Sequence, residues 1–153
     1  MKEALKEGDQ APAFKLETDS GEMFDLAAHK GETIILYFYP RSDTPGCTVE
    51  ACEFRDSSKK IAGKGSLIVG ISPDTVKAQA KFKTKFDLPF ILLADADRKV
   101  SEAYGVVKEK NMYGKKVMGV ARTTFIIGPD GKIEKIFDKV KPEGHAVQVL
   151  AAL

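Results

Sequence analysis

Residues 33–56 read TIILYFYPRSDTPGCTVEACEFRD, and they predict a buried strand that leads directly into a helix. Residues 33–39 form a nearly unbroken run of β-branched, aromatic and leucine side chains, which is typical of a strand covered on both faces. Pro40 ends the strand, because proline cannot donate a ladder hydrogen bond. Thr44 is a favoured N-cap and the proline after it suits the first helical position, so we expect a helix from there to about Gly63.

The only two cysteines of the chain, Cys47 and Cys52, fall in this predicted helix. Cys47 lies in the first turn, where free backbone N–H groups and the positive end of the helix dipole favour a thiolate over a thiol. Cys52 follows five residues later, which places the two Cα atoms about 8.6 Å apart in a regular helix. A disulfide needs Cα atoms within about 7 Å. If the cysteines pair, the helix must first unwind locally, as in a catalytic cycle.

Length and charge favour a single domain spanning residues 1–153 with no affinity for nucleic acid. Lysine and arginine number 24 and aspartate and glutamate 22, so the formal net charge is only +2. We interpret the one local gathering of lysines as a solvated loop and expect no binding to nucleic acid. These lysines are Lys108, Lys110, Lys115 and Lys116.

Neither a signal peptide nor a membrane span is expected. Residues 1–7 contain no apolar run, and no stretch approaches the roughly 20 apolar residues that a membrane helix needs. We therefore expect a soluble cytoplasmic protein. Two cysteines in a reducing compartment are more often catalytic, sensing or metal-binding than structural.

The remaining elements predict an α/β protein in which strands and helices alternate. They are an N-terminal hairpin (13–17 and 23–26), strands at 67–71 and 90–93, a helix at 74–86, a second hairpin (122–127 and 132–137) and a helix at 143–153. This order indicates a thioredoxin-like fold, with a mixed central sheet and helices on both faces. Sites in such sheets gather beyond the carboxyl ends of central strands, which points to the loop at 40–46.

Residues 40–47, PRSDTPGC, match the Pro-x-x-x-Thr-x-x-Cys motif of the peroxiredoxins, and residues 50–56, EACEFRD, continue it. The chain resembles the peroxiredoxin Q branch of that family, also called bacterioferritin comigratory protein. The similarity runs from about Gly8 to the terminal helix. It implies that Cys47 attacks the peroxide and that Cys52, five positions on, is the resolving cysteine.

The same resemblance assigns roles to three further residues. Thr44 and the matching arginine, Arg122, hold the peroxide, and Pro40 shields the pocket. Arg122 supplies a permanent charge, and the N–H groups of Gly46 and Cys47 stabilise the developing oxyanion. Attack cleaves the O–O bond and leaves a sulfenic acid, which condenses with the second cysteine to a disulfide. Thioredoxin or a similar dithiol then reduces the pair.

The resemblance implies no cofactor and no metal. Two cysteines without neighbouring histidines cannot complete a tetrahedral metal site. The partners expected are a hydroperoxide substrate and a dithiol reductant. We expect a monomer, because the chain ends at Leu153 without the C-terminal extension that joins subunits of typical two-cysteine peroxiredoxins.

Other interpretations remain open on the residues alone. Cys52 is ordinary core filler on composition, and Arg122 is an ordinary charge at the end of a strand. Glu50 either orders Arg122 or lies on the helix surface. The same two cysteines also suit a peroxide sensor or redox relay. A thioredoxin-type disulfide oxidoreductase is disfavoured, because four residues separate the cysteines here and two separate them in its motif.

Overall fold

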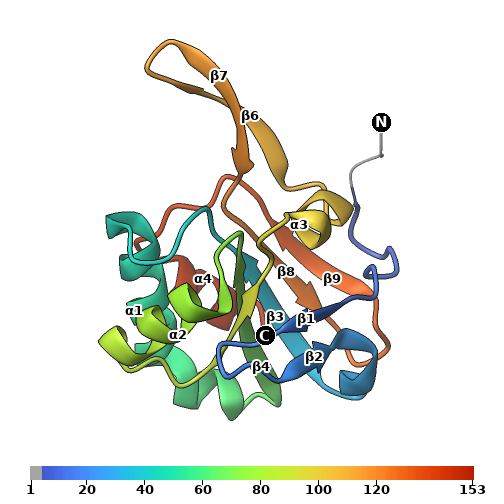
Figure 1. The fold of residues 1–153 in the computed structure, drawn as a ribbon. Coiled ribbons are helices and arrows are strands. Elements are labelled where there is room, and N and C mark those ends of the chain that lie inside the picture. Colours follow the sequence, from blue (N-terminus) through green and yellow to red (C-terminus); the bar gives the residue numbers. More distant parts are fainter. Residues whose placement is uncertain (1–4) are drawn as a thin grey trace.

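A five-stranded mixed sheet forms the centre of the protein, for which the computed structural model describes residues 5–153. Its strand order is β5-β4-β3-β8-β9 (Figure 1). The five strands are β3 (Thr33–Phe38), β4 (Ser66–Ser72), β5 (Ile91–Ala94), β8 (Thr123–Ile127) and β9 (Ile133–Phe137). The central strand β3 pairs in parallel with β4 and antiparallel with β8, which confirms the predicted mixed sheet.

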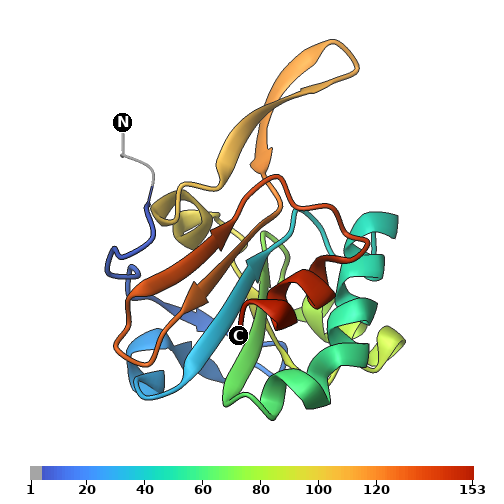
Figure 2. The ribbon, with the colours of Figure 1, turned by 180° about the vertical axis from the view of Figure 1, so that it is seen from behind.

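Both faces of the sheet are covered. Successive residues of β3 point to opposite sides, so the strand contributes to a core on each face. One core contains Ile34, Leu36 and Phe38, and the other contains Ile35, Tyr37 and Tyr39. The first face carries β1 (Lys15–Glu17), β2 (Met23–Asp25), the 3-10 helix η1 (Leu26–His29) and α3 (Lys99–Ala103). The second carries α1 (Pro45–Ala62), α2 (Val76–Phe86) and α4 (His145–Ala151), and Figure 2 shows α4 lying across the sheet.

This arrangement confirms the predicted thioredoxin-like fold with its N-terminal hairpin. The hairpin joins the body of the protein at the edge strand β5, since Asp19 N donates to Leu92 O at 2.9 Å. The helix α3 was not expected from the sequence. It is held by the buried carboxylate of Asp95, which accepts hydrogen bonds from the N–H groups of Val100 and Ser101. Among residues 5–153, no helix has the length and apolar character to cross a membrane.

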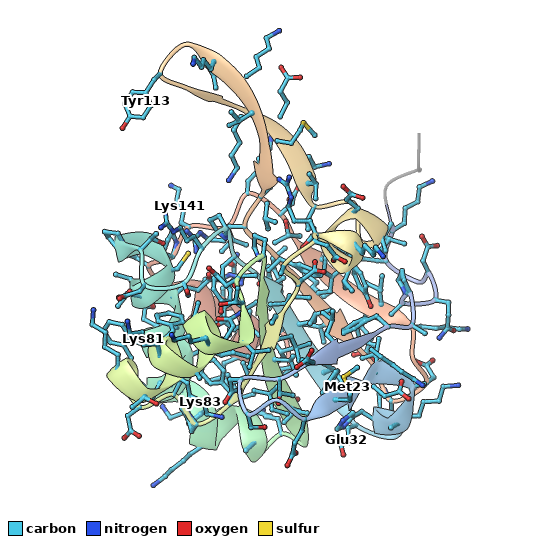
Figure 3. The ribbon with its side chains drawn as sticks, in the orientation of Figure 1. Met23, Glu32, Lys81, Lys83, Tyr113 and Lys141 are labelled. Atoms are coloured by element: carbon cyan, nitrogen blue, oxygen red, sulfur yellow. The ribbon has the colours of Figure 1, made fainter. Side chains whose placement is uncertain are left out.

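The lysine-rich segment predicted as a loop is instead a β-hairpin, formed by β6 (Val107–Met112) and β7 (Lys115–Val120). It projects from the body of the protein, with Tyr113 at its far end (Figures 1 and 3). Tyr113 and Gly114 both have positive φ, 54° and 79°, as a two-residue hairpin turn of type I′ requires. The prediction failed because this turn lacks the usual Asn-Gly or Asp-Gly signal and lysines interrupt the apolar alternation.

Candidate active site

Cys47 lies in the first turn of α1, the helix that follows the carboxyl end of the central strand β3. Pro45 occupies the first helical position, and Thr48 N donates to Thr44 O at 2.8 Å to close the first turn. Cys47 is only 1% exposed and packs in the same core as Tyr37 and Tyr39. The predicted placement of a thiol in the first turn of this helix is therefore what the structure shows.

Arg122 reaches Cys47 from the opposite part of the chain, 75 residues away in sequence. Strand β8 begins directly after Arg122, and its register pairs Thr123 with Phe38 at the end of β3. The guanidinium Nη1 consequently lies 3.4 Å from Cys47 Sγ. The same nitrogen donates to Glu50 Oε1 at 2.8 Å. The structure thus brings together a thiol, a permanent cation and a carboxyl group.

Glu50 is the residue of this site that the sequence left undecided. It does not lie on the helix surface, since it is only 1% exposed and faces Arg122 one turn of α1 after Cys47. Its second oxygen, Oε2, is buried and has no hydrogen-bond partner among the described residues. A signal did exist in the sequence, because residues three and four apart share one helix face and Cys47, Ala51 and Phe54 already mark a buried one.

Burial and mutual charge set the ionisation of the Arg122 and Glu50 pair. Burial raises the pKa of Glu50 to about 7, and the attraction of Arg122 only partly opposes that rise. Burial alone would lower the pKa of Arg122, but the charges of Cys47 and Glu50 and their hydrogen bonds outweigh it and raise that pKa. Arg122 is therefore always charged, whereas Glu50 changes its charge near neutral pH.

Gly46 gives Arg122 the space to lie against the start of α1. A Cβ at this position would meet Arg122 Nη2 at 3.1 Å and Pro142 Cγ at 3.4 Å. The backbone after β9 also reaches the site, since Val140 N donates to Arg122 O at 3.2 Å. Nothing in the sequence indicated that this later segment borders the site. A side chain at position 46 would displace either the guanidinium or this bordering segment.

Thr44 occupies the predicted N-cap position, but its hydroxyl does not cap the helix. The hydroxyl donates instead to Arg41 O at 2.9 Å. The predicted N-cap position is confirmed, but the side chain makes no capping hydrogen bond. The lone pairs of the same oxygen stay available to accept a hydrogen bond. Pro40 is half-buried in the loop between β3 and Thr44.

Cys52 lies in the same unbroken helix as Cys47, and both cysteines are free. Cys52 is partly exposed, unlike Cys47. The turn that carries it is tied to two other helices. Glu53 Oε1 accepts from Gly144 N at 2.8 Å at the start of α4, and Arg55 Nη1 donates to Phe86 O at 2.8 Å at the end of α2. The unbroken helix therefore holds the two cysteines apart.

Replacing Glu50 with glutamine is expected to change how stability depends on pH. Glu50 binds its proton at about pH 7 when folded and near its ordinary value of 4.5 when unfolded. Between these values the folded state holds more protons, so this group lowers stability as pH rises, by roughly 3 kcal/mol in total. The stability of the wild type relative to Glu50→Gln should fall by that amount between about pH 5 and pH 8, measured by urea unfolding.

The quantity to measure is the difference in unfolding free energy between the wild type and Glu50→Gln. The buried His145 changes stability with pH in the opposite sense to Glu50. Burial lowers the pKa of His145, so its contribution to stability grows as pH rises. That contribution is common to both proteins and cancels. An unchanged difference between pH 5 and pH 8 would show that Glu50 is as fully ionised in the folded state as in the unfolded state, so that its pKa is not raised.

The site contains no candidate metal centre. In residues 5–153, no group of three or more histidine, cysteine, aspartate or glutamate side chains is placed to hold a metal ion. What the geometry offers is a buried sulfur at a helix N-terminus, paired with a guanidinium. Such a setting suits a sulfur nucleophile.

Comparisons with known proteins agree with this geometry. The model of the AhpC/TSA family matches residues 7–136. The chain is 49% identical over 150 residues to a putative peroxiredoxin bcp of Coxiella burnetii, covering 98% of this chain and 99% of the relative. It is 45% identical over 146 residues to peroxiredoxin Bcp of Bacillus subtilis, covering 95% and 93%.

Solved structures lead to the same family. A peroxiredoxin Q of Xanthomonas campestris superimposes with a TM-score of 0.87 at 41% identity, covering 91% of this chain and 88% of that one. A mutant PrxQ of Xylella fastidiosa superimposes with a TM-score of 0.93 at 32% identity, covering 99% and 96%. The chain therefore belongs to the AhpC/TSA family, as a peroxiredoxin of the peroxiredoxin Q or bacterioferritin comigratory protein branch.

Proposed function

We propose that this peroxiredoxin reduces hydrogen peroxide and organic hydroperoxides through Cys47 and is recycled through Cys52 by thioredoxin or a similar dithiol. The observation that carries the proposal is the 3.4 Å contact between Arg122 Nη1 and Cys47 Sγ at the first turn of α1. Family membership supports the peroxidase activity itself. The assignment of individual residues rests on the geometry and on the motif they match.

In the first step the Cys47 thiolate attacks one oxygen of the hydroperoxide. The O–O bond breaks, the sulfur becomes a sulfenic acid, and the other oxygen leaves as water or an alcohol once it gains a proton. Arg122 is placed to stabilise both the thiolate and the charge that develops on the leaving oxygen. Thr44 already donates to Arg41 O, so its oxygen is free to accept the peroxide proton. Gly46 keeps the guanidinium close, and Pro40 shields the entry.

In the second step the thiol of Cys52 attacks the sulfenic sulfur, and water leaves as the disulfide forms. Helical geometry separates the two Cα atoms by about 8.6 Å, so α1 must unwind between them. Unwinding disrupts the hydrogen bond from Arg122 to Glu50 and exposes the disulfide to a dithiol. Two thiol-disulfide exchanges with the reductant then restore both thiols. The cytoplasmic location and the monomeric state stay predictions.

The test is a single-turnover reaction followed by a coupled assay. Reduced protein is mixed with one equivalent of hydrogen peroxide, and free thiols, intact mass and far-UV circular dichroism are recorded. We expect both thiols to disappear, a Cys47–Cys52 linkage in the peptide map, and a loss of helical signal. Thioredoxin with its reductase and NADPH should then sustain turnover. One reaction per molecule without sustained turnover would favour a peroxide sensor or relay over an enzyme.

Arg122→Met is expected to slow the reaction of Cys47 with hydrogen peroxide by about 10²–10³-fold, because it removes a donor aimed at the sulfur and the leaving oxygen. The measurement is the second-order rate constant by stopped flow. The double variant Arg122→Met with Glu50→Gln avoids leaving a buried carboxylate without its cation, and Glu50→Gln alone is the matched control. An unchanged rate constant in the double variant would show that Arg122 does not act on the reacting atoms.

A further inference from the structure

Lys110 lies in the projecting hairpin, and its charged side chain points toward the base of the hairpin, on the side of the active site. It lies in β6, yet its Nζ donates to Val120 O at 2.6 Å, at the base of β7 and two residues before Arg122. Lys110 is half-buried, whereas Lys108 on the same face of the same strand is exposed. The side chain of Lys110 is thus partly buried at the base of the hairpin, whereas that of Lys108, two residues earlier, is exposed to solvent.

Gly119 leaves the space that the Lys110 side chain needs to reach the Val120 carbonyl. Lys110 pairs with Val117 in the hairpin register, so Gly119 lies diagonally across from it on the same face. A Cβ at position 119 would meet Lys110 Cδ at 3.2 Å, Cε at 3.4 Å and Nζ at 3.6 Å. The lysine stem therefore runs closely over the glycine backbone. The base of the hairpin is fixed as well, since Ala121 N donates to Val106 O at 2.7 Å.

The ammonium group of Lys110 is electrostatically coupled to the reacting residues. Burial lowers the pKa of Lys110 and the positive charge of Arg122 lowers it further, while Cys47 opposes both. Among the ion pairs of the described residues, Glu109 pairs with Lys116 at 3.6 Å, and none involves Lys110. A backbone carbonyl uses one of the three ammonium protons. Lys110 thus retains positive charge and donors that no carboxylate of residues 5–153 neutralises.

Arg122 differs from Lys110 in this respect. Its Nη1 already contacts both Cys47 Sγ and Glu50 Oε1. Above about pH 7 the Glu50 carboxylate balances its charge. An anionic group on a substrate bound at Cys47 is therefore attracted to Lys110, for which no ion pair is found among the described residues. Because long-range attraction between charges favours encounter as well as binding, the effect belongs in the second-order rate constant.

We propose that Lys110 is a specificity-determining residue that favours hydroperoxides carrying a carboxylate over neutral hydroperoxides of the same size. The proposal rests on the proposed peroxidase function. The hydroperoxide oxygen is attacked by Cys47 and held by Arg122, while the carboxylate of the same molecule is attracted to the ammonium of Lys110. The chemistry of O–O cleavage is the same for both substrates, so only their relative rate constants change.

The experiment compares cumene hydroperoxide with its para-carboxylate at pH 8, where Glu50 is mostly ionised, by stopped-flow oxidation of the reduced protein. The measured quantity is the ratio of the two second-order rate constants, carboxylate over neutral. We expect Lys110→Met to lower that ratio roughly five- to tenfold, the range of a partly exposed ion pair. Lys108→Met, which removes the same charge from the same strand, should leave the ratio within about twofold of the wild type. Lys110→Arg should restore most of it.

Added salt provides a second readout, because screening acts on the charged substrate alone. The ratio should fall with salt in the wild type and much less in Lys110→Met. Equal ratios in the wild type and Lys110→Met would overturn the proposal, as would an equal loss in Lys108→Met. A wild type that reacts with neither hydroperoxide would overturn the proposed function itself, a result distinct from an unchanged ratio between two measurable rates.

Discussion

Cys47→Ser is expected to reduce hydroperoxide consumption to the uncatalysed rate while the fold is kept. The substitution exchanges one atom in a side chain that is only 1% exposed, so packing changes little. A neutral serine hydroxyl lacks the nucleophilicity of a thiolate toward peroxide. The measurement is peroxide loss on mixing with reduced protein, with circular dichroism to check folding.

The control for this variant is Cys52→Ser, which retains the attacking sulfur. Cys52→Ser should consume its first equivalent of peroxide at the wild-type rate, whereas Cys47→Ser should not. Peroxide consumption by Cys47→Ser at the wild-type rate would place the nucleophile elsewhere, and Cys52 would then be the only remaining thiol.

Cys52→Ser is expected to abolish turnover with thioredoxin, although the first reaction proceeds. Without a second thiol the sulfenic acid on Cys47 has no partner within the chain, so it persists or is oxidised further by excess peroxide. Mass spectrometry should find one added oxygen after one equivalent and two added oxygens after an excess. A sulfenic-acid-specific trap should label the first product. Full thioredoxin-dependent cycling in this variant would exclude Cys52 as the resolving residue.

The same variant separates helix unwinding from peroxide reaction. Wild-type protein treated with peroxide should lose amide protection in the first turns of α1, because the disulfide cannot form across intact helix. Oxidised Cys52→Ser should keep that protection, since it forms a sulfenic acid without a cross-link. Equal protection of α1 in reduced and oxidised wild type would mean that the disulfide forms without unwinding.

The sequence predicted the parts of the molecule whose patterns are local. A few neighbouring residues were enough to predict three features. These are the buried strand β3, the start of α1 at its proline and the turn between β8 and β9. The neighbourhood of Arg122 is not local. It depends on the antiparallel register that sets Thr123 opposite Phe38, and from the residues alone Arg122 was an ordinary strand-end charge.

Glu50 and Lys110 show two different limits of sequence interpretation. Glu50 shares a helix face with Cys47, yet the sequence left its burial undecided, and its ionisation depends on desolvation by the surrounding core. Lys110 belongs to a segment whose lysines suggested a solvated loop. Only the hairpin register and the space over Gly119 reveal that one of those lysines turns back toward the site.

The hydrogen bonds that hold the first half of α1 also affect the reduction potential of the two cysteines. Reduced protein keeps the bonds from Arg122 to Glu50, from Gly144 to Glu53 and from Arg55 to Phe86 O. A disulfide that needs α1 to unwind forfeits at least the first of these, which stabilises the dithiol relative to the disulfide. For a two-electron couple, about 1.4 kcal/mol of such preference raises the reduction potential by about 30 mV. If Cys47 and Cys52 pair as proposed, the packing of one helix end makes the oxidised protein a stronger oxidant, and one that a dithiol reduces more readily.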